Sequence, residues 1–266
     1  MSTNNSTITS QHLPFLNHVI RGEGEPLVLI HGLFGSLENL NMVAKTLADH
    51  FKVISVDVRN HGSSFHHKSM NYEEMSDDIF ALLDHLNINS CDILGHSMGG
   101  KIAMQCALSK PERIKKLIVA DIAPVEYPPH HNEIIAGLLS INTKEINNRQ
   151  DADKQLAKYV NEPGVRQFLL KNLIKTESGF TWRANIENVA NDYNSIAQGF
   201  ELRRQFNGPT LFIKGGNSNY ITSEHQAVIS TLFPLAKAKI IQGAGHWLHA
   251  EKTVAFNKIV NDFLSA

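Results

Sequence analysis

The chain has 266 residues, 42% of them hydrophobic, and its 25 basic and 26 acidic residues almost cancel. This length favours one large α/β domain with an insertion over two equal domains, and the small net charge argues against a nucleic-acid partner or electrostatic binding to an anionic membrane. Two cysteines are too few for a disulfide scaffold, so we expect a reducing compartment.

The first residues form a polar tail, residues 1–12, that lacks the basic and apolar regions of a signal peptide. No apolar run reaches the roughly 20 residues that span a bilayer. These features predict a soluble, cytoplasmic protein without stable membrane insertion. The segment FLNHVIRGEGEP, residues 15–26, predicts an antiparallel strand or hairpin at the front of the domain.

Short apolar runs then recur along the chain, and they lack the strict alternation of half-buried strands. This pattern is typical of parallel strands covered on both faces. The runs are 26–30, 52–56, 91–94, 116–120, 210–213 and 238–241, and the clearest helical stretches between them are 37–49, 72–87, 99–109, 223–232 and 250–264. Alternation of this kind predicts a mostly parallel, doubly wound α/β core formed by residues 1–122 and 207–266.

Residues 123–206 interrupt this alternation, because they contain no strand-like run. Helical stretches are predicted at 131–140, 151–160 and 163–175, since an 84-residue loop without structure (206 − 122) is implausible in a compact domain. This helical insertion follows a strand that ends near Ala120. Ligands of open α/β sheets bind at the carboxyl ends of strands, so we expect the insertion to form a lid over a site.

Gly95-His96-Ser97-Met98-Gly99 follows one of the strands and precedes a helix. The pattern Gly-x-Ser-x-Gly in this context is typical of a nucleophile held on a sharp strand-to-helix turn. Small residues are needed on both sides of the serine because larger side chains would collide in the turn. The alternative is an inert glycine-rich turn, but the surrounding strand and helix favour Ser97 as a nucleophile.

A serine nucleophile requires a base, and His246 is the best placed of the 14 histidines. It lies in a glycine-rich turn after the last strand, at the same sheet edge as Ser97. The pairs His66-His67 and His130-His131 could suggest metal binding. However, neighbouring side chains point in different directions and no acidic or cysteine partner has ligand spacing. No metal site is predicted.

With serine first and histidine near the end, the chain resembles the α/β-hydrolase superfamily. The segments HGLFGSLENL, DVRNHG, GHSMGGK, DIAPVEY, GGNSNY and GAGHWLHAEK are similar to those of bacterial YbfF-type esterases, from about Pro26 to the last helix. The resemblance implies hydrolysis of carboxylic esters and acyl thioesters beneath a lid, without a cofactor.

The oxyanion hole is expected to consist of two backbone amides. The elbow rule assigns Met98, the residue after the nucleophile, and the resemblance implies Leu33, directly after His31-Gly32. Side chains of both segments and of the insertion are predicted to contact substrate: His31, Phe34, His96, Leu138, Phe168 and Trp247. Leu139 and Leu169 are further candidates to line or stabilise an acyl pocket.

The third catalytic residue departs from the common superfamily pattern, because Asn217 stands where an aspartate usually follows the strand TLFIKGG. An amide cannot supply the charge that stabilises an imidazolium. Asp121 follows the strand next to the elbow strand and is the position that the YbfF type uses by resemblance. Asp57, Asp192 and Glu224 are the alternatives, and a helix-capping role for Asp121 remains open.

Three functions are compatible with these motifs. The first is a serine hydrolase acting on a small-molecule ester or thioester. The second is a lyase similar to menaquinone-pathway succinyl-hydroxy-cyclohexadiene-carboxylate synthase, for which Arg166, Arg183, Arg203 and Arg204 could bind a substrate carboxylate. The third is a binding module, although such proteins generally lose the serine or histidine. The hydrolase is favoured, and the sequence gives no indication of oligomeric state.

Overall fold

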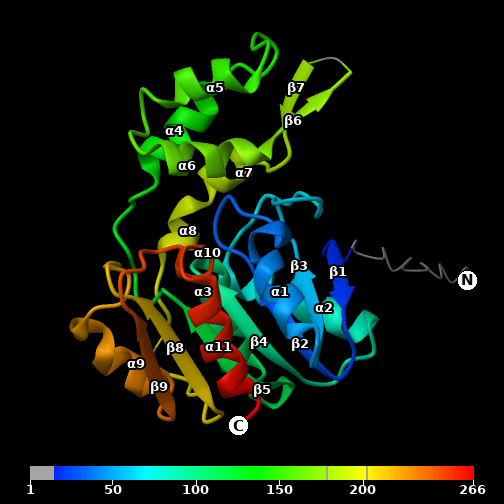
Figure 1. Ribbon diagram of the computed structural model, residues 1–266, viewed down its shortest axis with the longest axis vertical. Coiled ribbons are helices and arrows are strands. Elements are labelled where there is room, and N and C mark those ends of the chain that lie inside the picture. The colour runs from blue at the N-terminus through cyan, green and yellow to red at the C-terminus, as the bar shows by residue number, and fades with distance from the viewer. Residues whose placement is uncertain (1–14, 178, 202) are drawn as a thin grey trace, which may run out of the picture.

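The computed structural model describes residues 15–177, 179–201 and 203–266, so the predicted polar tail lies outside the described residues. A seven-stranded sheet has the order β1-β3-β2-β4-β5-β8-β9 (Figure 1). Only β1 runs antiparallel, pairing with β3, and the other pairs are parallel. The strands are β1 His18–Arg21, β2 Glu25–Ile30, β3 Phe51–Val56, β4 Cys91–His96, β5 Ile114–Ala120, β8 Thr210–Gly215 and β9 Ala236–Ile241. The predicted α/β-hydrolase fold is confirmed.

Helices cover both faces of the sheet, which explains why the central strands consist almost entirely of buried residues. On one face, α1 (Asn41–Leu47) and α11 (Thr253–Leu264) share a core with the strands. On the other face, α2 (Tyr72–His85), α3 (Met98–Ser109) and α9 (Gln226–Leu232) do so. Neighbouring residues of β4 serve opposite faces: Ile93 belongs to the second core and Leu94 to the first, and both are fully buried.

The remaining helical turns are short and connect the longer elements. They are α10 Leu248–Glu251 and the 3-10 turns η1 Leu37–Leu40, η2 Pro111–Arg113, η3 Leu170–Asn172 and η4 Ser223–His225. Within the described residues, no helix combines the length and the apolar character needed to cross a membrane.

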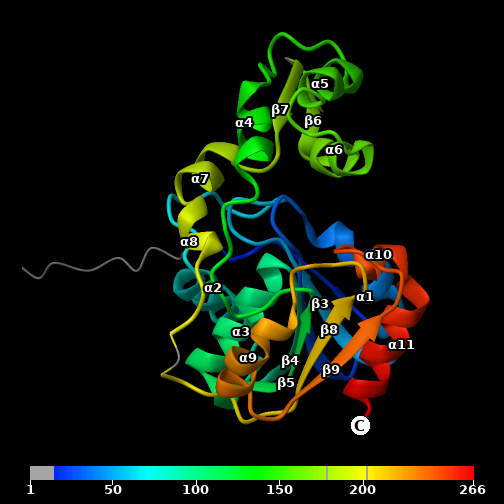
Figure 2. The same ribbon diagram turned by 90° about the vertical axis from the view of Figure 1, so that its left-hand side faces the viewer.

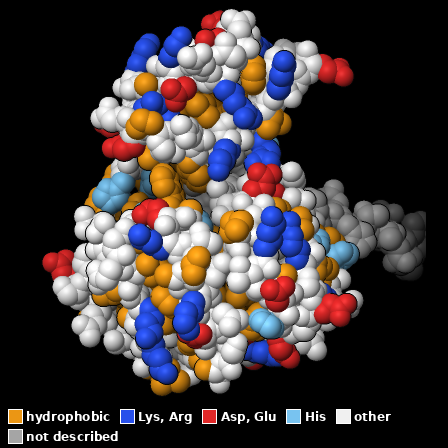
Figure 3. All heavy atoms as spheres, viewed as in Figure 1, with side chains coloured by type: hydrophobic (Ala, Val, Ile, Leu, Met, Phe, Trp, Pro, Cys, Tyr) orange, Lys and Arg blue, Asp and Glu red, His pale blue; other side chains and the backbone are white. Residues whose placement is uncertain are grey.

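The segment between β5 and β8 stands above the carboxyl ends of the strands, at the top of both ribbon views (Figures 1 and 2). It contains α4 Asn132–Ser140, α5 Arg149–Leu156, α6 Pro163–Leu169, β6 Leu173–Thr176, β7 Gly179–Trp182, α7 Ile186–Asn191 and α8 Tyr193–Ala197. The molecule narrows between this segment and the sheet layer, and hydrophobic side chains gather along the narrow part (Figure 3).

One expectation for this segment was wrong. The sequence predicted no strands in it and a helix over 163–175, but β6 and β7 form a two-stranded antiparallel sheet and α6 ends at Leu169. The strands have only four residues each and pair only with each other. Because one face of such a hairpin stays open to solvent, its residues do not form the apolar run by which the buried strands were found.

Candidate active site

Ser97 occupies the sharp turn between β4 and α3. Its backbone angles, φ 55° and ψ −122°, are rarely adopted by residues other than glycine. A Cβ on Gly95 would stand 2.0 Å from the Gly99 carbonyl oxygen, and one on Gly99 would stand 2.3 Å from that of Ile30. Neither flanking position can therefore carry a side chain, which is the physical reason for the Gly-x-Ser-x-Gly pattern.

Ser97, His246 and Asp121 form a continuous hydrogen-bonded chain. The Nε2 atom of His246 lies 3.0 Å from Ser97 Oγ, and its Nδ1 atom lies 2.7 Å from Asp121 Oδ2. A carboxylate only accepts, so Nδ1–H donates to Asp121 and Nε2 is free to accept the serine proton. The three residues follow β4, β5 and β9, whose carboxyl ends meet at one edge of the sheet (Figure 1).

The loop after β8 holds the Asp121 carboxylate, although it contributes no acid. The amide of Gly215 donates to Asp121 Oδ1 at 2.9 Å, and the Ser218 hydroxyl donates to Oδ2. The Tyr220 ring stacks on the imidazole of His246, with centroids 3.9 Å apart and planes 20° apart. Asp121 is completely buried and has a left-handed φ of 53°. These contacts fix the carboxylate and the imidazole in one orientation.

Ser218 and Tyr220 are site residues that sequence reasoning missed. Their only signal was their place in the segment NSNY, which starts where an acid is usually expected. The side chain of Asn217 itself is exposed, and the backbone N–H of this residue donates to the Ala244 carbonyl at 2.8 Å.

The other candidate carboxylates lie elsewhere. Asp57 accepts from the amides of Leu37 and Ser63, both at 2.8 Å, and thus organises the loops after β2 and β3. Asp192 accepts from the amide of Met70, and Glu224 is exposed in η4. None of these three carboxylates is hydrogen-bonded to His246 in the described part of the chain.

The loop that carries Leu33 is held in place by a histidine from a second loop. The Phe34 amide donates to Nε2 of His61 at 3.0 Å, which leaves this amide unavailable for a substrate oxygen. Phe34 has a φ of 59°. Burial lowers the pKa of His61 to about 3, so the ring stays neutral and can accept this bond. Leu33 and Met98 both lie beside Ser97 on the wall of a small cavity.

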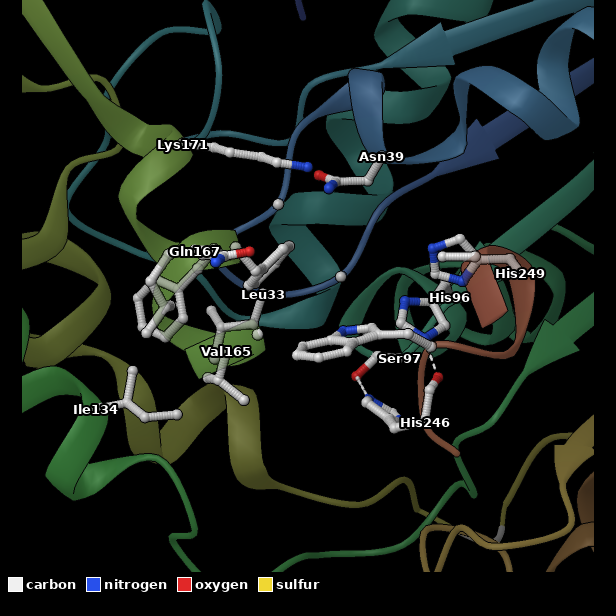
Figure 4. Close-up of a pocket in the computed structure, with 18 of the residues that line it drawn as sticks. Leu33, Asn39, His96, Ser97, Ile134, Val165, Gln167, Lys171, His246 and His249 are labelled. Carbon is white, nitrogen blue, oxygen red and sulfur yellow. Dashed lines mark hydrogen bonds between the residues drawn. The ribbon is translucent and has the colours of Figure 1, made fainter. Parts of the chain in front are cut away.

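A larger cavity of about 480 Å³ opens at Ser97 between the sheet edge and the segment after β5. Leu33, Ile134 and Val165 lie across it from Ser97 and His246 (Figure 4). Lys171 and Asn39 lie at its far side, where polar side chains replace apolar ones (Figure 4). The arrangement offers an apolar chamber with a polar rim.

Four of the six predicted substrate-contacting residues line this cavity: Phe34, His96, Phe168 and Trp247. His31 and Leu138 are not among its described lining residues. His31 is buried, and its Nε2 accepts from the Val58 amide at 3.1 Å. Leu138 packs inside the helical segment with 1% exposure. Of the two further candidates, Leu169 lines the cavity and Leu139 is 49% exposed.

Three histidines lie near His246 without replacing it; His96 and His249 are buried, and His131 is half-buried. Burial lowers the pKa of His96 well below its usual value and lowers the pKa values of His131 and His249 to about 4. His96 Nε2 lies 2.8 Å from the His246 carbonyl oxygen, and its ring contacts the edge of His249 at 4.4 Å between centroids. Neutral rings at physiological pH keep the site apolar.

The four arginines considered for a carboxylate substrate are absent from the described lining of this cavity. The Arg166 guanidinium donates to Asp153 at 2.8 Å, and that of Arg183 lies 3.4 Å from Glu38. Arg203 and Arg204 are exposed beside a different hollow near α2 and α8. Lys171 is the cation on the cavity wall among the described residues.

Comparisons with known proteins agree with this geometry. Residues 25–146 match the family model described as alpha/beta hydrolase fold. The chain is 40% identical to Esterase YbfF of Escherichia coli over 90% of its own length and 93% of that protein. It is also 40% identical to the sn-1-specific diacylglycerol lipase ABHD11 of Mus musculus, over 95% of its own length and 86% of that protein.

A solved structure titled Marine microorganism esterase superposes with a TM-score of 0.91 at 39% identity, covering 94% of this chain and all of that one. The chain therefore belongs to the α/β-hydrolase family. Within that family, its identity over almost the whole sequence places it among the YbfF-type esterases.

Proposed function

We propose that this protein is a serine hydrolase that cleaves carboxylic esters and acyl-CoA thioesters through an acyl-enzyme on Ser97. The observation that carries the proposal is the hydrogen-bonded chain from Ser97 Oγ through His246 to a completely buried Asp121 carboxylate. Relatives named as an esterase and as a diacylglycerol lipase support ester cleavage in particular.

In the first half-reaction, Ser97 Oγ attacks the acyl carbon while His246 Nε2 takes the serine proton. The carbonyl oxygen becomes negative and is stabilised by the amides of Leu33 and Met98. Asp121 stabilises the imidazolium and keeps Nδ1 protonated. His246 then gives its proton to the departing alkoxide oxygen or thiolate sulfur, which leaves an acyl ester on Ser97.

In the second half-reaction, a water molecule replaces the departed group. His246 removes a proton from this water as its oxygen attacks the acyl carbon, and the same two amides hold the new oxyanion. Collapse of the intermediate breaks the bond to Ser97, whose oxygen recovers the proton from His246. The free acid leaves, and no metal or cofactor takes part in the cycle.

Residues 123–206 act as the lid of this site in our proposal, and residues 1–122 with 207–266 form the hydrolase core. Phe34 and Trp247 from the core and Phe168 from the lid line the same cavity and supply apolar contact for the substrate. The Phe168 and Trp247 rings contact each other across the two parts, with centroids 5.4 Å apart. A lid that excludes water strengthens the electrostatic interactions at the reacting carbonyl.

The lyase alternative is disfavoured by the same cavity. Its substrate carries carboxylates, and the arginines that could bind them are either paired with Asp153 or Glu38 or exposed elsewhere. The binding-module alternative is disfavoured because the chain retains both Ser97 and His246, and the two lie within hydrogen-bonding distance of each other.

A chromogenic ester assay on the purified protein, with an acyl-CoA assay beside it, tests the proposal. We expect turnover of at least one ester that disappears in Ser97→Ala while the circular dichroism spectrum is unchanged. Turnover that persists in Ser97→Ala would refute the nucleophile. Activity with the menaquinone-pathway substrate of the synthase, and none with esters or thioesters, would favour the lyase.

A further inference from the structure

Two cavities of very different size meet at Ser97. The larger one, about 480 Å³, contains His246 in its wall. The smaller one, about 40 Å³, also reaches Ser97 but lacks His246 among its described lining residues. Leu33, Ser97 and His131 belong to both walls. His131 is fixed between them, because its Nδ1 lies 2.7 Å from the Tyr193 hydroxyl.

The chemistry of the site assigns a different part of the substrate to each cavity. His246 has to protonate the departing oxygen or sulfur, so the leaving group lies on the side of Ser97 that His246 faces. That side is the larger cavity. The acyl chain is bonded to the same tetrahedral carbon and points away from the leaving atom, toward the smaller cavity.

We propose that the smaller cavity is the acyl subsite and that it restricts this enzyme to short, uncharged acyl groups, while the larger cavity accepts a bulky alcohol or thiol. One water-sized sphere needs roughly 10–15 Å³ of such space, so the chamber holds about two to four heavy atoms beyond the carbonyl carbon. The inference rests on the proposed function and deepens it by naming the substrate class.

Apolar and aromatic side chains form much of the wall of the acyl subsite, and they come from both the core and the segment after β5. Met98 and Ile122 contribute from the core, and Tyr127 and Ile196 contribute from the segment. A charged acyl group would lose its hydration there, and the Lys101 ammonium is already engaged by three backbone carbonyls. A short hydrocarbon chain has no charge whose hydration would be lost, and it buries apolar surface there.

The floor of the subsite is tied in place by Lys101, a buried residue of α3 with 1% exposure. Its ammonium donates to the carbonyl of Val125 at 2.8 Å, to that of Ala197 at 3.2 Å and to that of Gln198. All three of its protons are therefore used by the two chain segments that lead into and out of the lid, and only its alkyl stem is left for the chamber.

A second hydrogen bond fixes the same floor. The Tyr72 hydroxyl donates to the Ile196 carbonyl at 2.6 Å, and the Lys101 ammonium lies 5.6 Å from the Tyr72 ring centre. Lengthening the chamber would break these buried bonds, and each broken bond would leave an unpaired polar group. The depth of the subsite is thus set by the packing that attaches the lid.

The test compares kcat/KM for 4-nitrophenyl acetate, butyrate, octanoate and dodecanoate, which share one leaving group. For the wild-type protein we expect octanoate to fall at least a hundredfold below butyrate. Ile196→Ala enlarges the chamber and should raise the octanoate-to-butyrate ratio at least tenfold. Ile196→Phe fills it without removing contacts and should lower the butyrate-to-acetate ratio, which keeps the test decisive if the alanine variant unfolds.

Ile134→Ala is the matched control. Ile134 belongs to the described lining of the larger cavity and not to that of the smaller one. This variant should leave the chain-length ratios within twofold of wild type. Octanoate turnover within threefold of butyrate in the wild-type protein would overturn the inference, as would an equal shift of the ratio in Ile134→Ala and Ile196→Ala. Failure of the proposed function looks different: no ester of any length would be hydrolysed above the level of Ser97→Ala.

Discussion

The loops after β5 and β8 lie side by side at the sheet edge and contribute in different ways to the orientation of His246. The β5 loop supplies the carboxylate of Asp121, at a left-handed φ of 53°. The β8 loop supplies no charge, but its Gly215 amide and Ser218 hydroxyl hold that carboxylate, and its Tyr220 ring covers His246.

This difference indicates that the acid can be supplied by either of two neighbouring strands and still occupy the same place beside the histidine. Strands β5 and β8 are paired in parallel, with Ala120 opposite Ile213, so their carboxyl ends lie next to each other. We therefore expect that a carboxylate at either end could reach His246. The loop that loses the acid is then free to act as the support of the other.

Removal of the nucleophile should cause the largest loss of ester turnover, larger than any substitution in the β5 or β8 loop. Ser97→Ala should lower ester turnover on the order of 10⁶-fold without unfolding the protein, as in other serine triads. Steady-state kinetics and circular dichroism measure the two quantities. Turnover within a hundredfold of wild type would mean that neither loop serves Ser97.

The β5 side of the comparison is tested by Asp121→Asn, which keeps the shape and removes the charge. In a serine protease the equivalent change lowers turnover by about 10⁴, and a loss of this order is expected. Asp57→Asn and Asp192→Asn are matched controls, since their carboxylates bond to loop amides instead of His246, and their effect on the turnover of folded protein should be far smaller. A folded Asp121→Asn variant within tenfold of wild type would place the acid elsewhere.

The β8 side is tested by Ser218→Ala, which removes one donor and leaves the carboxylate in place. Loss of one such hydrogen bond, about 1.4 kcal/mol, should reduce kcat about tenfold. Asn217→Ala, a change next to it in an exposed side chain, should stay near wild type. Equal losses in Ser218→Ala and Asp121→Asn would show that the two loops contribute equally, and would contradict a supporting role for the β8 loop.

His131 and His249, which lie near His246, should affect stability and not turnover. Burial lowers the pKa values of His131 and His249 to about 4. Between pH 6.5 and 4 the unfolded chain therefore binds more protons than the folded one, and the free energy of unfolding falls as the pH falls. Each site contributes at most about 1.4 kcal/mol per pH unit.

Urea unfolding between pH 7.5 and 4.5 measures this dependence. His249→Gln should flatten it by the contribution of one histidine, because the glutamine cannot take up the proton. An unchanged slope in this variant would mean that His249 does not titrate in the way its burial implies.

Local patterns predicted the sheet, the elbow and the base. The glycines around Ser97 are required by contacts within a few residues and with β2, and His246 lies in the short turn after the last strand, so local patterns in the sequence were enough to predict both as site residues. Asp121 needed a family resemblance, because several carboxylates follow strands and their distance from His246 depends on strand order.

The remaining features depend on contacts between distant segments. Ser218 reaches Asp121 across 97 positions of the chain, and Lys101 reaches Gln198 across 97 as well. No local pattern marks either bond. The β6–β7 hairpin was missed because its strands are short and have one face open to solvent. The two cavities at Ser97 form only where the segment after β5 packs above the sheet.

The central claim is that Ser97 is a nucleophile activated through His246 by the β5 carboxylate. A fluorophosphonate probe, followed by peptide mass spectrometry and timed labelling, tests it directly in the wild-type protein and in Asp121→Asn. We expect one label, on Ser97, at a rate that falls at least a hundredfold in the folded variant. A label on another serine, or equal labelling rates in the two proteins, would contradict the claim.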